Sequence, residues 1–384
     1  MKVAVLGYGT VGAGVYSMLS DAPGMEAGPV LVRPGKAVES FMVSDAALIF
    51  GDPTVDAVVE TLGGLDPAYS YGMRALEAGK HFITANKAMV AAHGLELAAL
   101  AREKGAAFLF SAACGGGVPF LHNLALSAET DRIDAVSGIL NGTTNYMLDA
   151  MQRRGLSYGD ALREAQSLGY AESDPTADVS GLDALRKMQL ACAVAFGVLP
   201  QSGMLCEGME HFTAEDVEDI QSRGLVCRLL ARGSRTVESV SAYVEPVLFP
   251  RAAPESSVFT NNNMARYTGK RCGSIVLMGQ GAGRFPTASA VLRDLAAAQQ
   301  GARSMFPENC RAAEADNREA VHSYYIRTGG FAAVRLPLRS VLAQGEVVRA
   351  VTEPMSAEKM HALAQNIRKD GNDLFFASLE EKLC

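Results

Sequence analysis

The first 130 residues alternate short apolar runs with stretches of helical periodicity. The helical patterns occur at residues 11–19, 67–78 and 89–104, which are also rich in good helix formers. The apolar runs are expected to form strands at Val3–Leu6, Val30–Arg33, Ala57–Glu60, His81–Thr84 and Ala107–Phe110. Strands that alternate with helices are typical of βαβ units. We therefore expect an α/β domain in which helices cover both faces of a parallel sheet.

From residue 131 onward the pattern changes to a mixture of strands and helices. Arg132–Leu140 alternates like a strand with one exposed face. Further helices are expected at 144–153, 158–168 and 181–196, and further strands at Leu225–Ala231, Val237–Leu248 and Gly273–Met278. A helix at 287–299 closes this region, which we interpret as a mixed α+β block.

The remaining chain is expected to form a short appended module. Residues 300–320 are polar and irregular, which indicates a linker. Strand, strand, helix and strand patterns follow at Tyr324–Arg327, Ala333–Leu338, 356–369 and Leu374–Ala377. The predicted organisation is a nucleotide-type domain at 1–130 completed by the helix at 284–300, a second domain at 131–283, and a C-terminal module at 320–384.

Composition and charge narrow the class of protein. The chain has 384 residues, of which 48% are hydrophobic and 20% charged, so it can bury the cores of two or three domains. The net charge of −7 disfavours nucleic acid or an anionic membrane as the main partner. No apolar run reaches the ~20 residues of a membrane span, and the N-terminus has no signal-peptide pattern. The seven cysteines are scattered and lack metal-ligand spacing. We expect free thiols, no zinc site and a cytoplasmic location.

A glycine-rich loop directly follows the first strand and opens the first helix, with the sequence Gly7-Tyr8-Gly9-Thr10-Val11-Gly12. Gly7 permits a tight turn, Gly9 lets the backbone approach a pyrophosphate, and Gly12 lets helix and strand pack closely. The helix N-terminus offers N–H groups and partial positive charge to phosphates. This context predicts a Rossmann-type dinucleotide site, and the alternative is a glycine turn without a ligand.

The end of the second strand bears on the choice of cofactor. NAD-binding folds usually place Asp or Glu there, to bind the ribose 2′-hydroxyl. Here the expected strand ends in Arg33, and Lys36 follows closely. Cations at this place suit the 2′-phosphate of NADP, so the pattern favours NADP over NAD. An arginine after a strand is also an ordinary solvated surface residue.

The segment 169–187 is denser in carboxylates than its surroundings. A loop that leads into a helix carries Glu172, Asp174, Asp178 and Asp183. Ser180 is the expected N-cap of that helix. Asp183 and Lys187 then stand four positions apart on one helix face. The apolar sequence 188–196 that follows indicates that the helix is buried.

This arrangement is suited to acid–base chemistry on a small polar molecule. A lysine held beside an aspartate and partly desolvated can donate a proton to a developing alkoxide or remove one from an alcohol. Its cation also stabilises charge that builds on oxygen during hydride transfer. Neighbouring carboxylates can bind an ammonium group. The site therefore suits a small amino acid bearing an alcohol or aldehyde, and a solvated salt bridge is the plain alternative.

Other segments that follow predicted strands carry candidate ligands. Lys87 should emerge at the carboxyl edge of the sheet, where open α/β sheets bind ligands, or else be a surface lysine. Asn141–Asn145 is either a capped turn or a polar shelf for the substrate. Gly115–Gly117 could expose carbonyl oxygens to a cofactor or a cation. Gly279–Gly283 is either a plain loop or a second backbone surface near a nicotinamide.

Taken in order, these segments resemble homoserine dehydrogenase. The matching pieces are Gly7–Gly12, Glu60–Gly64, Thr84–Ala88, Gly115–Pro119, Gly138–Tyr146, Gly169–Lys187 and Gly281–Ala288. The resemblance covers roughly residues 1–300. It implies hydride transfer between a nicotinamide cofactor and L-aspartate 4-semialdehyde, giving L-homoserine in threonine, methionine and isoleucine biosynthesis. It also implies a homodimer or a larger homo-oligomer.

The resemblance assigns roles to individual residues. Lys187 and Asp183 match the catalytic pair, and Lys87 matches the second active-site lysine. The substrate-binding positions, with the polar shelf included, are Glu172, Asp178, Asn141 and Thr143. At the cofactor the resemblance places Gly9, Thr10, Val11, Gly63, Lys87 and Gly283, and the loop and strand patterns above add Gly7, Gly12, Arg33 and Lys36. A monovalent cation, usually sodium, is implied at Ser111, Cys114, Gly116 and Val118.

The chain departs from the family pattern at three places. Ser111 stands where the family commonly has Glu, which affects the cation site. The segment 21–53 is shorter than usual. The C-terminal module resembles a regulatory ACT domain at Tyr324–Arg327 and Leu374–Ala377, but its middle is abbreviated, so feedback inhibition by threonine does not follow.

Two other functions are compatible with the fold. A related dehydrogenase acting on another amino-acid semialdehyde or hydroxy acid would share the Rossmann domain. A non-catalytic nucleotide-binding sensor would bind the cofactor without turnover, but the presence of Lys87, Lys187 and Asp183 argues against it. In the predicted mechanism Lys187, oriented by Asp183, polarises the aldehyde and donates a proton to its oxygen as hydride arrives.

Overall fold

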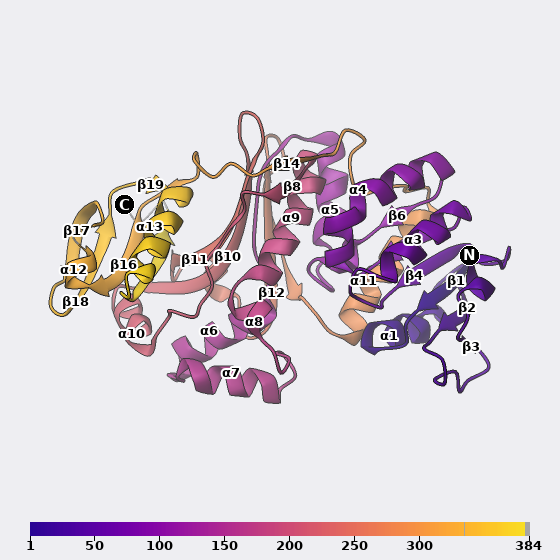
Figure 1. Cartoon of the computed structure of the whole chain (residues 1–384), viewed down its shortest axis with the longest axis horizontal. Helices are drawn as coiled ribbons and strands as arrows, with labels where there is room; N and C mark the ends of the chain where they lie inside the picture. The colour runs from indigo at the N-terminus through magenta and orange to yellow at the C-terminus, as the bar shows by residue number, and fades with distance from the viewer. Residues whose placement is uncertain (334, 381–384) are drawn as a thin grey trace. The chain divides into compact units, whose positions relative to one another are not determined.

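The structure, a computed structural model, describes residues 1–333 and 335–380 (Figure 1). These residues divide into two units, each assembled from separate stretches of the chain. The first unit consists of residues 1–133, 189–199 and 269–311. The second consists of residues 134–188, 200–268 and the described residues from 312 onward.

Parallel strands form the sheet of the first unit, in the order β3-β2-β1-β4-β5-β6. They are β1 (Lys2–Leu6), β2 (Glu26–Leu31), β3 (Met42–Val43), β4 (Ala57–Glu60), β5 (His81–Thr84) and β6 (Phe108–Leu109). The apolar residues at 3–6 and 57–59 are fully buried, as in a sheet covered on both faces. The strand order reverses between β1 and β4, where open α/β sheets bind their ligands. The predicted parallel α/β sheet is thus confirmed.

The helices of the first unit are α1 (Thr10–Leu19), α2 (Ala47–Phe50), α3 (Ala68–Glu77), α4 (Lys87–Lys104), α5 (Phe120–Thr130) and α11 (Arg284–Gln299). Helix α11 packs on α1, although most of the chain separates them in sequence. Gly14 permits this approach, because a Cβ there would lie 2.8 Å from the Arg284 carbonyl oxygen and 3.2 Å from Ala288 Cβ. Strand β13 (Gly273–Gln280) leads into α11.

A mixed sheet forms the second unit, with the order β12-β7-β10-β11-β20-β16-β18-β17 and with β9 beside β11. Its strands are β7 (Ile133–Ile139), β9 (Leu205–Cys206), β10 (Leu225–Arg235), β11 (Val240–Pro250), β12 (Asn262–Gly269), β16 (Tyr324–Gly329), β17 (Leu338–Ala343), β18 (Val347–Thr352) and β20 (Leu374–Leu379). β10 and β11 pair antiparallel along their whole length. β20 runs parallel to β11, with Val247 opposite Ser378.

The helices of the second unit are α6 (Gly142–Arg154), α7 (Tyr158–Ser167), α8 (Thr176–Val179), α10 (Ala214–Ser222), α12 (Gly330–Ala333) and α13 (Ala357–Lys369), and α9 (Leu182–Phe196) begins in it. We call residues 320–380 the C-terminal module. Its core contains Tyr324, Ile326, Met360 and Phe376, all at most 1% exposed. The short strands β15 (Val321–His322) and β19 (Met355–Ser356) pair at its start.

The second strand and the module differ from the sequence predictions. β2 ends at Leu31, so Arg33 lies in the loop after the strand. The strand predicted at Ala333–Leu338 was wrong, because α12 ends at Ala333 and β17 begins only at Leu338. Pro337 has a fixed φ and no N–H, so it does not fit within a strand ladder.

Several strands were not predicted from the sequence, among them β12 and β14. β12 has a polar sequence with adjacent Asn262 and Asn263, and pairing with β7 stabilises it rather than local propensity. β14 (Arg311–Glu314) lies within the expected linker and pairs with β8 (Val198–Ser202). Its side chains are mostly exposed, so no hydrophobic pattern marked it.

Candidate active site

The glycine-rich loop between β1 and α1 has a backbone that depends on its glycines. Gly7 has a φ of +99°, which L side chains rarely adopt. A Cβ at Gly12 would lie 2.1 Å from the Gly7 carbonyl oxygen, so a side chain does not fit there. Apart from Gly9 and its two neighbours in the chain, no heavy atom of the described residues lies within 4 Å of the position that a Cβ at Gly9 would take. The loop therefore leaves room for a phosphate at the N-terminus of α1, whose first residues are Thr10 and Val11.

A pocket of about 1050 Å³ lies beside this loop. Of the predicted cofactor residues, it is lined by Gly7, Gly9, Arg33, Lys36 and Gly63. Glu39 lines the same pocket and places a carboxylate near the two cations. Tyr8 and Phe41 form an aromatic part of the wall, and Tyr16 stacks on Phe41 with ring centroids 4.3 Å apart. The pocket thus combines phosphate-binding backbone, cations and flat apolar surface.

Glu60, at the end of β4, organises the loop that closes this pocket. Its Oε1 accepts hydrogen bonds from the N–H groups of Leu62 at 2.6 Å and Gly63 at 3.1 Å. Its Oε2 accepts from Thr84 Oγ1 at 2.5 Å, and the carboxyl group is fully buried. The sequence analysis gave Glu60 no role. The signal for it was an acidic residue that ends an otherwise apolar parallel strand.

Lys87 is the first residue of α4, and the helix start is fixed by Asn86. The Asn86 side chain caps the helix by accepting from Met89 N at 3.1 Å, and its Nδ2 donates to the Gly64 carbonyl at 2.6 Å. Asn86 N donates to Thr84 Oγ1 at 2.9 Å. The start of α4 and the loop at 62–64 are therefore joined by hydrogen bonds, which places Lys87 at the carboxyl edge of the sheet as predicted.

The positions predicted to bind a cation lie in the loop 111–118. Ser111 donates from N to Asp294 Oδ2 at 2.8 Å and from Oγ to Asp294 Oδ1 at 2.5 Å. Burial raises the pKa of Asp294 to about 7, against the Ser111 hydrogen bonds and the Arg293 charge, which lower it. The Ser111 hydroxyl is therefore committed to Asp294, and the potential ligands for a cation are backbone carbonyls. One of these, Val118 O, accepts from Phe120 N at 2.7 Å.

This loop packs against the loop that precedes α11. Gly117 N donates to the Gln280 carbonyl at 3.0 Å, and a Cβ at Gly116 would lie 2.4 Å from the Gly281 carbonyl oxygen. Gly283 has a φ of +125° and begins α11. Two backbone surfaces are thus held together at the carboxyl edge of the sheet. Within residues 1–333 and 335–380, no cluster of three or more His, Cys, Asp or Glu side chains could hold a metal ion.

In the second unit, Lys187 is held by two oxygens. Its Nζ lies 2.6 Å from Asp183 Oδ2 and donates to the Leu140 carbonyl oxygen at 2.6 Å. Both side chains of the pair are 12% exposed. The predicted pairing on one face of α9 is present, and it is a partly desolvated pair rather than a solvated surface bridge. These contacts fix the direction of the ammonium group, which can then transfer a proton to an adjacent oxygen.

Asn141 connects this pair to a second carboxylate. Its Nδ2 donates to Asp183 Oδ2 at 2.9 Å and to Asp178 Oδ1 at 2.7 Å. Its Oδ1 accepts from Thr144 N at 2.8 Å and so caps α6. The two interpretations of this segment, a capped turn and a polar shelf, are therefore compatible, because one amide group caps the helix and orients both carboxylates.

Asp178 and Thr143 complete the group of polar side chains. Thr143 Oγ1 lies 3.1 Å from Asp178 Oδ2 and donates to the Tyr170 carbonyl at 2.5 Å. Burial raises the pKa of Asp178, and the charge of Asp183 adds to this, whereas hydrogen bonds from Asn141 and Thr143 and the charge of Lys187 oppose it. Glu172 is exposed in the loop before α8.

The expected N-cap of α9 was wrong. Among the described residues no group hydrogen-bonds to Ser180 Oγ, which is buried. The helix instead directly follows Gly181, whose φ is +82° and whose carbonyl accepts from Leu185 N at 2.9 Å. The left-handed backbone of Gly181 makes the sharp turn from α8 into α9 that brings Asp183 next to Asn141.

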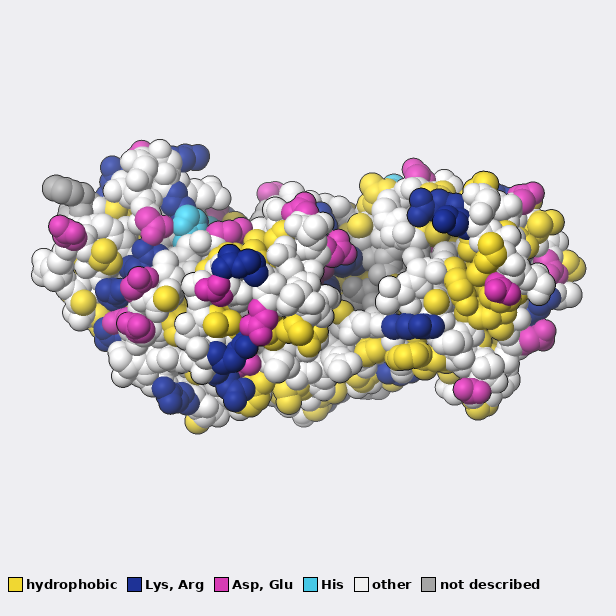
Figure 2. Space-filling view, turned by 90° about the horizontal axis from the view of Figure 1, so that it is seen from below, with side chains coloured by type: hydrophobic (Ala, Val, Ile, Leu, Met, Phe, Trp, Pro, Cys, Tyr) yellow, Lys and Arg dark blue, Asp and Glu magenta, His cyan; other side chains and the backbone are white. Residues whose placement is uncertain are grey.

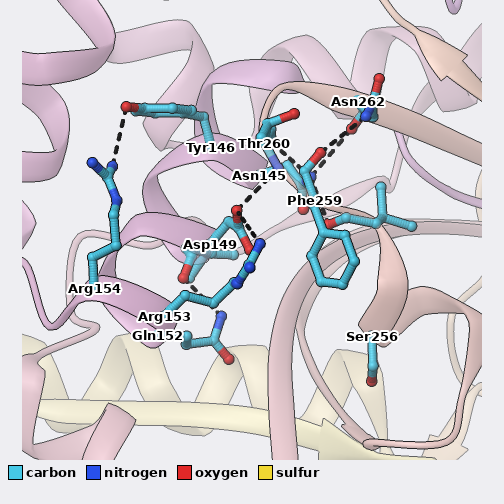
Figure 3. Close-up of polar contacts among 12 residues, drawn as sticks. Asn145, Tyr146, Asp149, Gln152, Arg153, Arg154, Ser256, Phe259, Thr260 and Asn262 are labelled. Carbon is cyan, nitrogen blue, oxygen red and sulfur yellow. Dashed lines mark hydrogen bonds and ion pairs between the residues drawn. The ribbon is translucent and has the colours of Figure 1, made fainter.

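Helix α6, which presents Asn141 and Thr143, is fastened to the loop before β12 (Figure 3). Asn145 Nδ2 lies within hydrogen-bonding distance of the carbonyl oxygens of Val258, Thr260 and Asn262, at 3.1, 2.9 and 3.2 Å. Asp149 Oδ2 accepts from Thr260 N at 3.1 Å. Arg153 lies over the Phe259 ring, 4.7 Å from its centroid. These contacts fix α6 along its length, which keeps its N-terminal residues in place.

Comparison with known proteins gives a consistent result over both units. Residues 7–111 match a family model described as the NAD binding domain of homoserine dehydrogenase, and residues 119–296 match the homoserine dehydrogenase model. A homoserine dehydrogenase of Synechocystis sp. is 37% identical over 319 residues, covering 77% of this chain and 72% of that protein. The chain belongs to the homoserine dehydrogenase family. It is therefore an oxidoreductase that uses a nicotinamide cofactor and a small-molecule substrate.

Other homoserine dehydrogenases extend the likeness. That of Corynebacterium glutamicum is 38% identical over 317 residues, covering 77% of this chain and 71% of the relative. The crystal structure of a homoserine dehydrogenase from Thiobacillus denitrificans has a TM-score of 0.87 at 29% identity and covers 99% of this chain and 98% of that chain. A hyperthermophilic archaeal homoserine dehydrogenase, solved with NADPH, has a TM-score of 0.67 at 24% identity, covers 81% of this chain and 99% of that chain, and supports the fold alone.

The surface of this homoserine dehydrogenase family member carries both charge signs. Figure 2 shows acidic and basic side chains interspersed on the face in view, together with hydrophobic side chains.

No helix among residues 1–333 and 335–380 is long and apolar enough to cross a membrane. The six cysteines of the described part of the chain are free, and Cys384 lies outside the described residues.

Proposed function

We propose that this chain catalyses the NADP-dependent interconversion of L-aspartate 4-semialdehyde and L-homoserine in the biosynthesis of threonine, methionine and isoleucine. The observation that carries the proposal is the position of Lys187 Nζ, 2.6 Å from both Asp183 Oδ2 and the Leu140 carbonyl. A charged lysine fixed in this way can supply a proton to an aldehyde oxygen at a defined point.

In the proposed mechanism, Lys187 binds the carbonyl oxygen of the substrate and donates a proton to it as that oxygen becomes an alkoxide. Asp183 keeps the ammonium group charged and oriented, because a nearby carboxylate favours the protonated form of an amine. The nicotinamide cofactor supplies the hydride in this direction and accepts it in the reverse one. Lys87 is proposed to bind or polarise the same reacting centre.

We propose that the amino acid part of the substrate is held by the carboxylates of the second unit. Asp178, oriented by Asn141 and Thr143, offers a fixed acceptor, and Glu172 offers an exposed one for the substrate ammonium group. Burial raises the pKa of Asp178, so a cation beside it would stabilise the charged carboxylate. Asn141 and Thr143 therefore serve as a shelf that orients a carboxylate.

For the cofactor we propose NADP in preference to NAD. Arg33 and Lys36 both line the pocket beside the glycine-rich loop, where they suit a 2′-phosphate. Glu39 in the same pocket favours the free 2′-hydroxyl of NAD, and the two cations outnumber it. The pyrophosphate is proposed to lie on Gly9, Thr10 and Val11 at the N-terminus of α1, between the glycines at 7 and 12. Gly63, Lys87 and Gly283 are proposed to contact the nicotinamide half.

A monovalent cation, sodium, is proposed at the loop carbonyls of Ser111, Cys114, Gly116 and Val118. Carbonyl oxygens are suitable ligands for such hard ions, and no side-chain carboxylate takes part, because Asp294 is occupied with Ser111. A rise in melting temperature with sodium chloride over choline chloride would support the site. Equal melting temperatures in the two salts would remove it.

We also propose how the chain divides into domains, which oligomer it forms and where in the cell it acts. Residues 1–130, completed by the helix at 284–300, are proposed to bind the cofactor. Residues 131–283 are proposed to bind the substrate and to form a homodimer or larger homo-oligomer. Residues 320–384 are proposed to be an abbreviated ACT-like module, and the protein to act in the cytoplasm.

The test is the absorbance of reduced nicotinamide with purified protein. L-Homoserine is supplied with NADP, then with NAD, and other hydroxy amino acids follow. Homoserine-dependent reduction that is faster with NADP supports the whole proposal, and faster reduction with NAD overturns the cofactor preference alone. Lys187→Ala should abolish turnover and retain cofactor binding. Cofactor binding by the wild-type protein without turnover of any substrate would favour a sensor instead.

A further inference from the structure

Residues 205–219, which we call the bridging segment, run from β9 into α10 and contact the turn that starts the catalytic helix. Cys206 Sγ donates to the Ser180 carbonyl oxygen at 3.1 Å, and Met209 N donates to the Val179 carbonyl oxygen at 2.9 Å. Both acceptors belong to the turn between α8 and α9. The two residues proposed to be catalytic follow this turn, Asp183 in the first turn of α9 and Lys187 in the second.

The bridging segment and this turn are packed without spare room. A Cβ at Gly208 would lie 2.3 Å from the Val179 carbonyl oxygen, and a Cβ at Gly181 would lie 3.1 Å from Cys206 Sγ. Gly181 is also the residue whose carbonyl starts α9, by accepting from Leu185 N. Because close-packed groups transmit displacement, a shift of the bridging segment must move the first turn of α9.

The C-terminal module holds the other side of the bridging segment through a pair of charges. Arg368 of α13 donates two parallel hydrogen bonds to Glu207, from Nη1 to Oε2 at 2.9 Å and from Nη2 to Oε1 at 2.7 Å. Glu207 is 8% exposed, so this two-bond ion pair is largely shielded from solvent. Glu207 N also donates to the Val244 carbonyl at 2.8 Å, which ties the same residue to β11.

A second arginine of the module, Arg327, contacts the bridging segment on the C-terminal side of Glu207. Arg327 of β16 donates to Asp216 Oδ1 at 2.8 Å and to the His211 carbonyl at 2.7 Å. Asp216 is fully buried. Arg327 also donates to Oδ2 of Asp373, a residue of the module itself, at 2.6 Å. The module therefore contacts the bridging segment through buried charges at several places along its length.

The module is also built into the sheet that supports these contacts. β20 lies between β11 and β16, so the strands of the module continue the sheet of the second unit. On α13, His361 Nε2 lies 3.2 Å from Glu245 Oε2 of β11, and both side chains are buried. An effector module on a flexible tether would need none of these buried charges.

We propose that Arg368 and Glu207 are positioning residues for the reaction. The C-terminal module, through this pair, holds the bridging segment against the turn at 179–181, and the turn sets the place of Asp183 and Lys187. The inference rests on the proposed role of Lys187. It adds that the module acts on proton transfer, while the cofactor pocket, in the first unit, is independent of it.

The test compares Arg368→Ala, Arg368→Lys and Glu207→Gln with a matched control in the same module. The control is Arg335→Ala, which removes an ion pair with Asp370 whose two side chains are 52% and 51% exposed. A displaced catalytic group should lower kcat for homoserine about tenfold in Arg368→Ala, with NADP affinity changed less than about twofold. Arg368→Lys should recover part of the loss, and Arg335→Ala should match the wild type.

A second readout does not depend on turnover. The rate at which an amine-reactive reagent modifies Lys187, measured by mass spectrometry of its peptide, should change in Arg368→Ala and in Glu207→Gln. It should not change in Arg335→Ala. Glu207→Gln keeps the shape of the side chain, and melting temperatures confirm that each variant is folded.

The outcomes separate this inference from the proposed function. Wild-type kcat and wild-type labelling of Lys187 in folded Arg368→Ala would overturn the inference and leave the function in place. Parallel loss of kcat and NADP affinity would show general destabilisation and would overturn it as well. If the wild-type protein turned over no homoserine, the proposed function would fail, and the labelling comparison would still decide whether the module positions Lys187.

Discussion

Asn141 Nδ2 lies 2.9 Å from Asp183 Oδ2, the same oxygen that lies 2.6 Å from Lys187 Nζ. One carboxylate oxygen is therefore held at once by the N-cap residue of α6 and by the lysine of α9. The Asn141 amide cannot rotate away, because its Oδ1 caps α6 through Thr144 N. The direction of the lysine thus depends on a second helix as well as on its own.

Asn141→Asp should separate the two functions of this side chain. Aspartate caps a helix about as well as asparagine, but it cannot donate to Asp178 or Asp183 and adds a third negative charge there. We expect kcat to fall at least about tenfold, with a small change in melting temperature. Asn141→Ala should lose roughly 1 kcal/mol of stability as well. Steady-state kinetics and thermal melting measure both, and a folded Asn141→Asp enzyme with normal kcat would exclude an orienting role.

Removal of the two cations of the cofactor pocket should reverse the cofactor preference. Arg33→Ala combined with Lys36→Ala takes both charges away from the proposed 2′-phosphate. We expect kcat/KM for NADP to fall by about tenfold or more, since each hydrogen bond to a charged group contributes about 1.5–3 kcal/mol. The value for NAD should be unchanged. Glu39→Gln removes the carboxylate of the same pocket and should raise kcat/KM for NADP but not for NAD. Equal effects of these substitutions on both cofactors would contradict the assignment of Arg33 and Lys36 to the 2′-phosphate.

The buried carboxyl group of Asp294 should make stability depend on pH. Burial raises its pKa from the usual 3.8 to about 7. A carboxyl group with a raised pKa in the folded state stabilises that state in its protonated form. The contribution is complete below about pH 4 and is lost as the pH rises through 7.

Asp294→Asn remains neutral at every pH and can still accept from Ser111 N. Relative to this variant, the free energy of unfolding of the wild-type protein should fall by roughly 2 kcal/mol between pH 5 and pH 8. Urea unfolding at the two pH values measures it. A stability difference that stays constant with pH would show that Asp294 keeps an ordinary pKa.

Thr260 should be a site where a substitution stabilises the protein. Its φ of +57° is the one left-handed conformation of a non-glycine residue among residues 1–333 and 335–380. For a β-branched side chain this costs roughly 1–2 kcal/mol. Thr260→Asn, which tolerates the conformation and keeps the N–H bond to Asp149, should raise the melting temperature. Thr260→Val keeps the strain and should not; a lower melting temperature for Thr260→Asn would contradict the argument.

Local signals in the sequence identified much of the nucleotide domain and of helix α9. The glycine-rich loop and the spacing of Asp183 and Lys187 depend on residues a few positions apart, and the structure has both as predicted. The acidic end of β4 is visible in the sequence, but the partner of Glu60 was not predictable, because Thr84 meets the carboxylate only when β4 and β5 are neighbours. Ser111 and Asp294 are likewise brought together only by the packing of α11.

The element boundaries likewise depend partly on local sequence signals and partly on contacts between distant segments. Ser180 is a residue type that favours N-caps, but the turn is made by the left-handed Gly181, where a Cβ would lie 3.1 Å from Cys206 Sγ of a distant segment. β12 and β14 have polar sequences and exist as strands because partners from elsewhere in the chain satisfy their backbones. Contacts between distant segments carry no local signature, so a single sequence does not reveal them.

The position of β20 in the second sheet has a consequence for how the protein is made. During synthesis, β11 and β16 leave the ribosome before residues 374–379, so each has an unpaired edge until β20 inserts between them. Open edges of this kind are where chains associate wrongly. Completion of the second unit is therefore a late event in biogenesis, and nascent chains stalled before residue 374 should be the species that require chaperones.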